Sequence, residues 1–141
     1  MPPDPALIRE TAGWLRKANR DLAAAEHDLR ADPPLLDDVA FHAQQAAEKA
    51  MKAFLTWHGQ PFRKTHNLIE LGEQVAHLDA SLEPLLRRAA PLSEYAWKFR
   101  YPGDVEQPTA EEARSAIDTA RAVFDAVAAL LPDASDSAPA R

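Results

Sequence analysis

The sequence contains no cysteine and only four glycines among its 141 residues. The lack of cysteine excludes disulfide bonds and thiolate zinc sites and favours a reducing compartment, so we expect a cytoplasmic protein. No run approaches the about 18 consecutive apolar residues of a membrane span. The N-terminus also lacks the basic and apolar regions of a signal peptide. We therefore expect no association with a membrane.

Motifs of several enzyme classes are absent as well. The chain has no Gly-rich phosphate loop, no Gly-x-Ser-x-Gly nucleophile elbow and no carboxylate motif that would hold magnesium for nucleotidyl transfer. It is therefore not expected to be a nucleotidyltransferase itself. No pair of histidines has the short spacing of a zinc motif, so we expect neither a metal site nor another cofactor. The histidines considered for such a site are His42, His58, His66 and His77.

The net charge of −6 argues against indiscriminate binding to nucleic acid, because phosphate binding needs clustered Lys and Arg. A local basic patch remains possible. The composition is rich in Ala, Leu, Glu and Arg, which favours helix, and the twelve prolines are expected mostly at helix ends and in connections. We predict an all-α protein.

The start and stop signals divide the first half of the chain into two long helices. The first is predicted over 5–31, with Asp4 as its N-terminal cap and a Pro-rich stop after it. The second is predicted over 37–58, with acidic residues in its first turn and Gly59 as its C-terminal stop. Both carry apolar residues at spacings of three and four, so each has a face that packs in a core.

The second half contains shorter helices. Asn67 is predicted to cap a helix of under three turns. Another helix begins near 79–81 and is kinked or divided by Pro91. A loop over 101–108 follows, because two prolines and a glycine occupy it. Thr109-Ala-Glu-Glu is a capping box that begins the last helix. We expect one domain over 1–132 and a flexible tail over 133–141, which has no large apolar residue.

The second helix has two unequal faces. Small and apolar side chains, many of them alanine, cover an arc of roughly 200°, where an ordinary surface helix needs roughly 100°. This pattern predicts that the helix is the packing centre of a bundle. The opposite arc carries a file of polar side chains, which either binds an anion or, as is more usual for such a face, is only solvated. The file consists of His42, Gln45, Lys49, Lys52 and Thr56.

Two residues of this helix fit neither face. Gln44 projects into the apolar arc, where a buried amide needs hydrogen-bond partners. Phe41 projects into the polar arc, where an aromatic ring needs cover. A partner subunit would supply that cover, so Phe41 is predicted to lie at a dimer contact.

Four blocks of the sequence together resemble the HEPN family, small helical domains of higher eukaryotes and prokaryotes named for nucleotide binding. The likeness extends over about 8–130. The blocks occur in this order: WLRKA (14–18), FHAQQAAEKAMKAFL (41–55), KTHNL (64–68) and YAWKFRYPGD (95–104). The resemblance implies an up-and-down bundle of four to five helices and a symmetric homodimer. It also implies a partner, because such proteins are often encoded beside a minimal nucleotidyltransferase, and some of these pairs act as toxin and antitoxin.

Many HEPN proteins are metal-independent ribonucleases that use an Arg followed a few residues later by a His. This chain departs from that motif, since no histidine follows Arg100. Arg20 and His27 have a similar spacing, but they lie in the first helix and we regard the match as coincidence. The resemblance therefore implies a non-nucleolytic member that binds a nucleotide or the transferase, more than a protein that binds RNA. The alternative is a divergent ribonuclease that uses Arg100 and His66.

The residues expected to contact a ligand carry cationic, aromatic or proton-transferring groups. Arg100 can donate two hydrogen bonds to a phosphate, Lys64 offers a point charge and Tyr101 offers a ring or a hydroxyl. His66 can donate, accept or transfer a proton near neutral pH. His42 and Lys49 are the members of the polar file included in this set. Tyr101 is also a possible acceptor of a nucleotidyl group, as the resemblance implies.

The same residues could instead have structural roles. Thr65 or Asn67 could make the segment around His66 a helix cap, and for His66 we favour that role. Arg100 could equally well fix its turn by pairing with Asp104 or Glu94. The bundle that the resemblance implies would allow the loops that carry His66 and Arg100 to lie near the end of the second helix, but the sequence does not establish whether they do.

Overall fold

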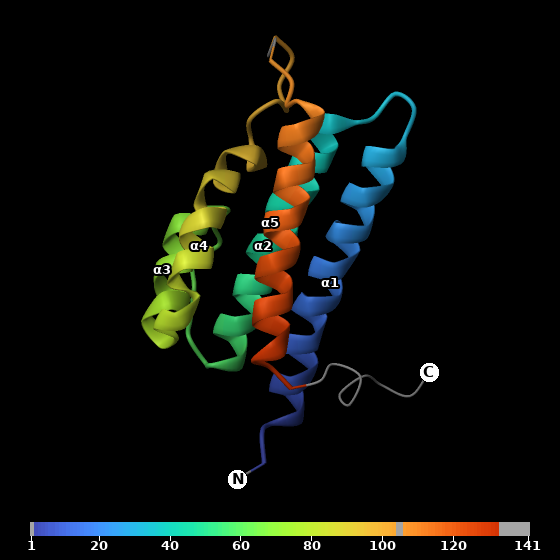
Figure 1. Ribbon diagram of the computed structural model, residues 1–141. Coiled ribbons are helices and arrows are strands. Elements are labelled where there is room, and N and C mark those ends of the chain that lie inside the picture. The colour runs from blue at the N-terminus through green and yellow to red at the C-terminus, as the bar shows by residue number, and fades with distance from the viewer. Residues whose placement is uncertain (1, 104–105, 133–141) are drawn as a thin grey trace, which may run out of the picture.

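The computed structural model describes residues 2–103 and 106–132, and all regular structure in these ranges is helical. The helices form an elongated bundle (Figure 1). The all-α prediction is confirmed for these residues. The elements in chain order are α1 (Pro5–Arg30), α2 (Leu36–Trp57), α3 (Leu68–Leu78), the 3₁₀ helix η1 (Ala80–Leu82), α4 (Glu83–Ala89), the 3₁₀ helix η2 (Ala90–Ala96) and α5 (Ala110–Ala129).

The N-terminal caps predicted for three helices are present. The side chain of Asp4 accepts a hydrogen bond from the first turn of α1, and that of Asn67 does the same for α3. Thr109 and Glu112 form the reciprocal capping box of α5, in which the backbone nitrogen of each lies 2.9 and 3.0 Å from the side-chain oxygen of the other. Each cap satisfies amides that a helix leaves without intrahelical partners.

Glycine and proline set the other boundaries. Gly59 has φ of 67°, a left-handed conformation that glycine adopts without a Cβ clash, and α2 ends just before it. Pro91 lies in η2, where the chain passes from α4 into 3₁₀ geometry, so the predicted division is confirmed. α3 has 11 residues and therefore makes about three turns, slightly more than expected.

α2 is the packing centre of the bundle, as its alanine-rich arc predicts. It contacts α1, α5, α3 and η2, and Figure 1 shows it behind α5 and beside α1. The alanines of its apolar face are fully buried, and their small side chains let the neighbouring helices approach closely. These are Ala43, Ala46, Ala47, Ala50 and Ala53.

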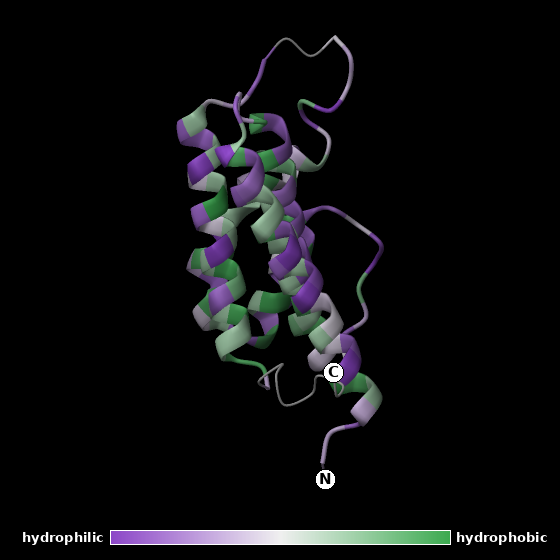
Figure 2. Cartoon of the chain, turned by 90° about the vertical axis from the view of Figure 1, so that its right-hand side faces the viewer, coloured by the Kyte–Doolittle hydropathy of each residue, from purple (hydrophilic) through white to green (hydrophobic). Residues whose placement is uncertain are grey.

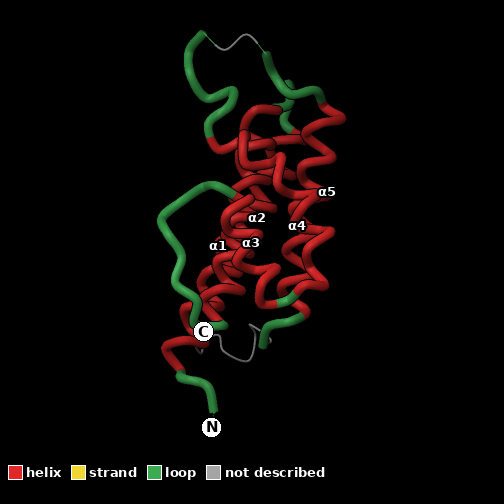
Figure 3. Tube along the Cα trace, turned by 90° about the vertical axis from the view of Figure 1, so that its left-hand side faces the viewer, coloured by secondary structure: helices red, strands yellow, loops and turns green. Residues whose placement is uncertain are grey.

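The connection between α2 and α3 determines where the candidate site forms. It leaves the end of α2 at Gly59 and runs back along the side of the bundle (Figure 3), so α3 begins beside the middle of α2. Gln44 in that middle segment donates a hydrogen bond to the carbonyl of His66 at 3.2 Å. Thr65 accepts from the amide of Asn67 at 3.0 Å, so this segment also caps α3 as expected.

The tail predicted over 133–141 lies outside the described residues, and so does Asp104, one of the two carboxylates considered for Arg100. None of the helices in the described ranges is both long and apolar enough to span a membrane.

Tyr95 of η2 is half-buried and lies near two carboxylates. Burial, followed by the nearby carboxylates of Glu112 and Glu94, raises its pKa above the ordinary value of 10.0. In the unfolded chain the phenol ionises near that ordinary value, so the stability that the neutral phenol contributes is present below it and is lost as the pH rises through the folded pKa. Tyr101→Phe leaves Tyr95 as the only tyrosine. Absorbance titration of this variant should give a midpoint above that of the urea-unfolded chain, and equal midpoints would contradict the burial effect.

Candidate functional site

The polar face of α2 contains two clusters, each built around one carboxylate. In the first, Asp21 of α1 lies between two side chains of α2 (Figure 1 shows the two helices side by side). His42 donates through Nδ1 to Asp21 Oδ1 at 2.9 Å, and Lys49 donates to Oδ2 at 2.6 Å. Asp21 is buried, so these charge-assisted bonds supply the partners that a buried carboxylate needs. The first cluster therefore joins α1 to α2.

The second cluster is built around Glu48, which is only 3% exposed. Its Oε2 accepts from Lys52 at 2.9 Å, and its Oε1 accepts from Gln44 at 3.0 Å and from His66 Nδ1 at 2.8 Å. Gln44 is fully buried and Gln45 donates to its Oε1 at 2.7 Å. The expectation that Gln44 needs partners in the apolar arc is thus confirmed, and its partners are now identified.

Lys52 shows how closely the second cluster is enclosed. Its ammonium lies 5.5 Å from the ring centroid of Trp14 and 5.7 Å from that of Phe62. The two rings themselves meet edge to face at 6.2 Å. Lys52 is therefore held between one carboxylate and two aromatic rings, which offset the cost of burying its charge.

These contacts correct the idea that the polar file is merely solvated. Lys52 and Thr56 are buried, at 7% and 8% exposure, and His42, Gln45 and Lys49 are half-buried. The solvated-face interpretation is wrong because α1 and the 58–67 connection cover this arc and bring acidic and aromatic side chains to it.

His66 differs from His42 in what its second ring nitrogen faces. The carboxylate of Glu48 only accepts, so His66 Nδ1 carries a hydrogen, and in the neutral ring the lone pair lies on Nε2. The His66 side chain is 66% exposed. His42 is 29% exposed and its Nε2 lies 4.0 Å from Asp28. Of the two, His66 presents the more accessible nitrogen.

Arg100 covers the ring of Phe41. Its guanidinium carbon lies 3.9 Å from the ring centroid, and His42 contacts another part of the same ring at a centroid distance of 5.5 Å. Cover for Phe41 thus comes from within the chain, so this residue no longer supports the prediction of a dimer contact. Arg100 is exposed, so its N–H groups can still donate hydrogen bonds to an anion.

The backbone before Arg100 is unusual. Phe99 has φ of 69°, a left-handed conformation that costs a bulky residue about 1–2 kcal/mol. Phe99 is buried and its ring lies 6.0 Å from that of Tyr95, so this packing holds the conformation. The strained residue fixes the direction in which the chain presents Arg100 and Tyr101.

The remaining predicted residues are on the surface. Tyr101 is 67% exposed and has an interaction with another part of the chain, and Lys64 is exposed on the 58–67 connection. The loops that carry His66 and Arg100 do not meet at the end of α2 but contact two different points along it. His66 contacts Glu48 and Arg100 contacts Phe41, seven residues and about 10 Å apart along the helix axis.

Comparison with known families decides the identity of this fold. The family model for HEPN domains matches residues 11–130, which is most of the chain. The chain belongs to the HEPN family. No curated protein and no solved structure gives a match. Both clusters, Arg100 and the 58–67 connection lie within the matched HEPN region.

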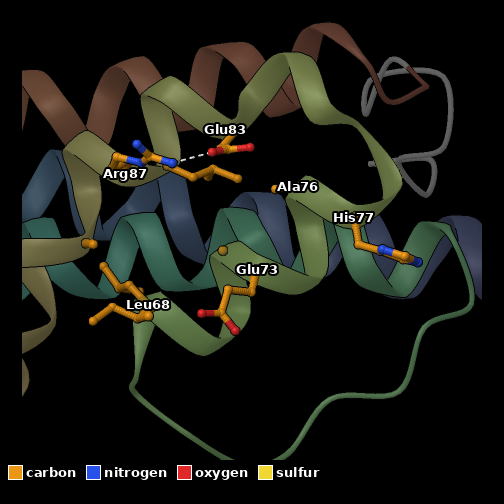
Figure 4. A pocket seen from close by; sticks show the side chains of 10 residues that line it. Leu68, Glu73, Ala76, His77, Glu83 and Arg87 are labelled. Atoms are coloured by element: carbon orange, nitrogen blue, oxygen red, sulfur yellow. Dashed lines mark hydrogen bonds and ion pairs between the residues drawn. The ribbon is translucent and has the colours of Figure 1, made fainter.

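A pocket that the sequence did not indicate lies elsewhere on the HEPN domain, between α3 and α4 (Figure 4). Its volume is about 490 Å³. Leu68 lies at one end of it, and the ion pair between Glu83 and Arg87 lies on its α4 side (Figure 4). None of the six predicted ligand residues lines this pocket. Its apolar residues follow the same helical spacing as core residues, so no sequence signal separates them from the core.

Proposed function

We propose that this HEPN protein binds a nucleotide through Arg100, Tyr101, Lys64 and His66, and that it acts as the accessory partner of a minimal nucleotidyltransferase. The observation that carries the proposal is the position of Arg100, which is exposed and whose guanidinium carbon lies 3.9 Å from the ring centroid of Phe41. The guanidinium fork matches the oxygens of a phosphate. Tyr101, next in the chain and exposed, offers a ring for base stacking.

The separation of the two contact points favours an extended ligand. Positions seven residues apart lie on nearly the same side of a helix, so Phe41 and Glu48 share one face of α2. Arg100 and His66 are therefore presented along the same face, about 10 Å apart in the axial direction. A single phosphate group is shorter than this span, whereas a nucleotide with its phosphates is long enough to contact both.

His42 and Lys49 have a supporting role in this proposal. Both donate to Asp21, so their charges are already compensated within the chain. His42 also contacts the ring on which Arg100 stacks. The first cluster therefore positions Phe41 and, through it, Arg100.

Calorimetric titration with nucleoside triphosphates, with and without the transferase encoded nearby, tests the proposal. Removing one charge-assisted contact costs about 1.5–3 kcal/mol, so Arg100→Ala should weaken binding about 10- to 100-fold. Arg88→Ala, an exposed arginine on α4, is the matched control and should bind like the unmodified protein. Equal affinity of Arg100→Ala, or no binding by either form even with the transferase, would overturn the proposal.

The homodimer that the resemblance implies is part of the same proposal. Sedimentation of the purified chain should give twice the mass of 15.5 kDa. Co-purification of the transferase with the chain should depend on Arg100, if both use the same surface. A monomer that never associates with the transferase would contradict this arrangement.

One observation favours a second candidate, a divergent ribonuclease. The buried Glu48 orients His66 through Nδ1 while the His66 side chain stays 66% exposed, which is the arrangement of a histidine that transfers protons. Cleavage of a structured RNA that His66→Ala abolishes, and that His77→Ala on α3 leaves intact, would favour this candidate over simple binding. No cleavage by the unmodified protein would exclude it.

A further inference from the structure

The outward face of α1 carries a stripe of basic side chains. At about 100° per residue, three arginines and one histidine fall within an arc of about 40°, and two more basic residues flank it. All six side chains are exposed. The stripe consists of Arg9, Arg16, Arg20 and His27, with Lys17 and Arg30 at its edges.

The stripe is long, and its charges are not compensated locally. It spans 21 residue steps and therefore about 30 Å. Figure 2, which views the bundle from the side of α1, shows hydrophilic positions recurring along this helix. No ion pair joins a stripe residue to a carboxylate anywhere in residues 2–103 and 106–132. Within α1 only one carboxylate, Glu10, is exposed.

This separation of charge is unusual for a protein with a net charge of −6. A face that is only solvated commonly mixes both signs. Here the exposed side chains of α1 include one carboxylate, whereas those of the neighbouring α5 mix both signs, with Arg114 among Glu111, Asp118 and Asp125. Arg121 of α5 and Glu26 of α1 pair at the boundary between the two helices, at 2.7 Å. The excess of basic side chains therefore lies on α1.

We infer that the basic stripe of α1 binds the phosphodiester backbone of nucleic acid, at a surface separate from the Arg100 site. Its length matches about nine nucleotides of one strand, at about 3.4 Å each. Four of its members are arginines, whose forked donors match phosphate oxygens. Protein–protein interfaces have an apolar core, whereas nucleic-acid interfaces are more polar and positively charged. The stripe has no large apolar side chain, so its composition fits nucleic acid.

The side chains of the stripe determine how selective its binding to nucleic acid can be. Phosphate contacts carry no sequence information, and the stripe contains no Phe, Tyr or Trp on which bases could stack. We expect binding that does not depend on base sequence and that does not distinguish RNA from DNA. Affinity should fall steeply with salt, because each neutralised phosphate releases counterions.

Fluorescence anisotropy with labelled single-stranded RNA and DNA and with duplex DNA tests this inference in the full chain. Arg16→Ala/Arg20→Ala should reduce the slope of log affinity against log salt by about 1.4 for single strands and 1.8 for duplex DNA, since two contacts are lost. Arg87→Ala/Arg88→Ala on α4 removes the same charge and should leave the slope unchanged. Circular dichroism establishes that both variants are folded.

Several outcomes would overturn the inference. One is an unchanged salt slope in the α1 variant, and another is an equal decrease in the α4 control. A third is binding of poly-glutamate but of none of the nucleic acids, which would identify an acidic protein as the partner. Loss of triphosphate binding in Arg100→Ala with oligonucleotide binding retained would support two separate surfaces.

Discussion

Glu48→Gln is expected to lower the free energy of unfolding by about 3–5 kcal/mol, the cost of leaving a buried charge without its partner. The substitution keeps the size of the side chain but removes the negative charge that Lys52 pairs with at 2.9 Å. Lys52 is 7% exposed and lies between two rings, so water has little access to its ammonium. Urea unfolding followed by circular dichroism measures the change.

Two further variants distinguish the cost of leaving a buried charge unpaired from the cost of losing an exposed ion pair. Glu94→Gln removes the same group from the exposed pair with Lys98, and we expect a loss of less than about 0.5 kcal/mol. Replacing both Glu48 and Lys52 with leucine should cost less than the sum of the two single changes, because no unpaired charge remains. Additive losses, or a Glu48→Gln effect as small as that of Glu94→Gln, would show that the cluster is not buried as described.

Ala47→Leu is expected to destabilise the fold by about 1–3 kcal/mol, because the larger side chain has no space at the centre of the bundle. Ala47 is fully buried on the helix that contacts α1, α3 and α5. Ala23→Leu on the exposed face of α1 is the matched control and should change stability by less than about 0.5 kcal/mol. Thermal unfolding of both variants measures the difference, and equal melting temperatures would contradict the central position of α2.

The helices and their ends could be predicted from the sequence because local chemistry determines them. The cap at Asp4, the capping box at Thr109, the stop at Gly59 and the division at Pro91 each depend on a few neighbouring residues. The central position of α2 was also predictable, since an apolar arc of such width must contact several neighbours.

The contacts that join the elements of the site were not predictable, because they connect residues that lie far apart in the chain. The pairs of Glu48 with Gln44 and Lys52 are local, since the partners lie four positions apart on one helix. Asp21 and Lys49 are 28 positions apart, and His66 and Glu48 are 18 apart. One signal was available: Asp21 adjoins the apolar seam of α1, where a carboxylate needs a partner. The sequence indicated that the ring of Phe41 needs cover, but not that Arg100 supplies it, because this contact depends on how the chain turns after η2.

We propose that a nucleotide contacts Arg100 and His66 together, while the pairs around Asp21 and Glu48 hold the fold. The direct test is an NMR titration of the labelled chain with a nucleoside triphosphate. We expect chemical-shift changes at Arg100, Tyr101, Lys64 and His66. Changes confined to the pocket between α3 and α4, or no changes either alone or with the nucleotidyltransferase present, would contradict it.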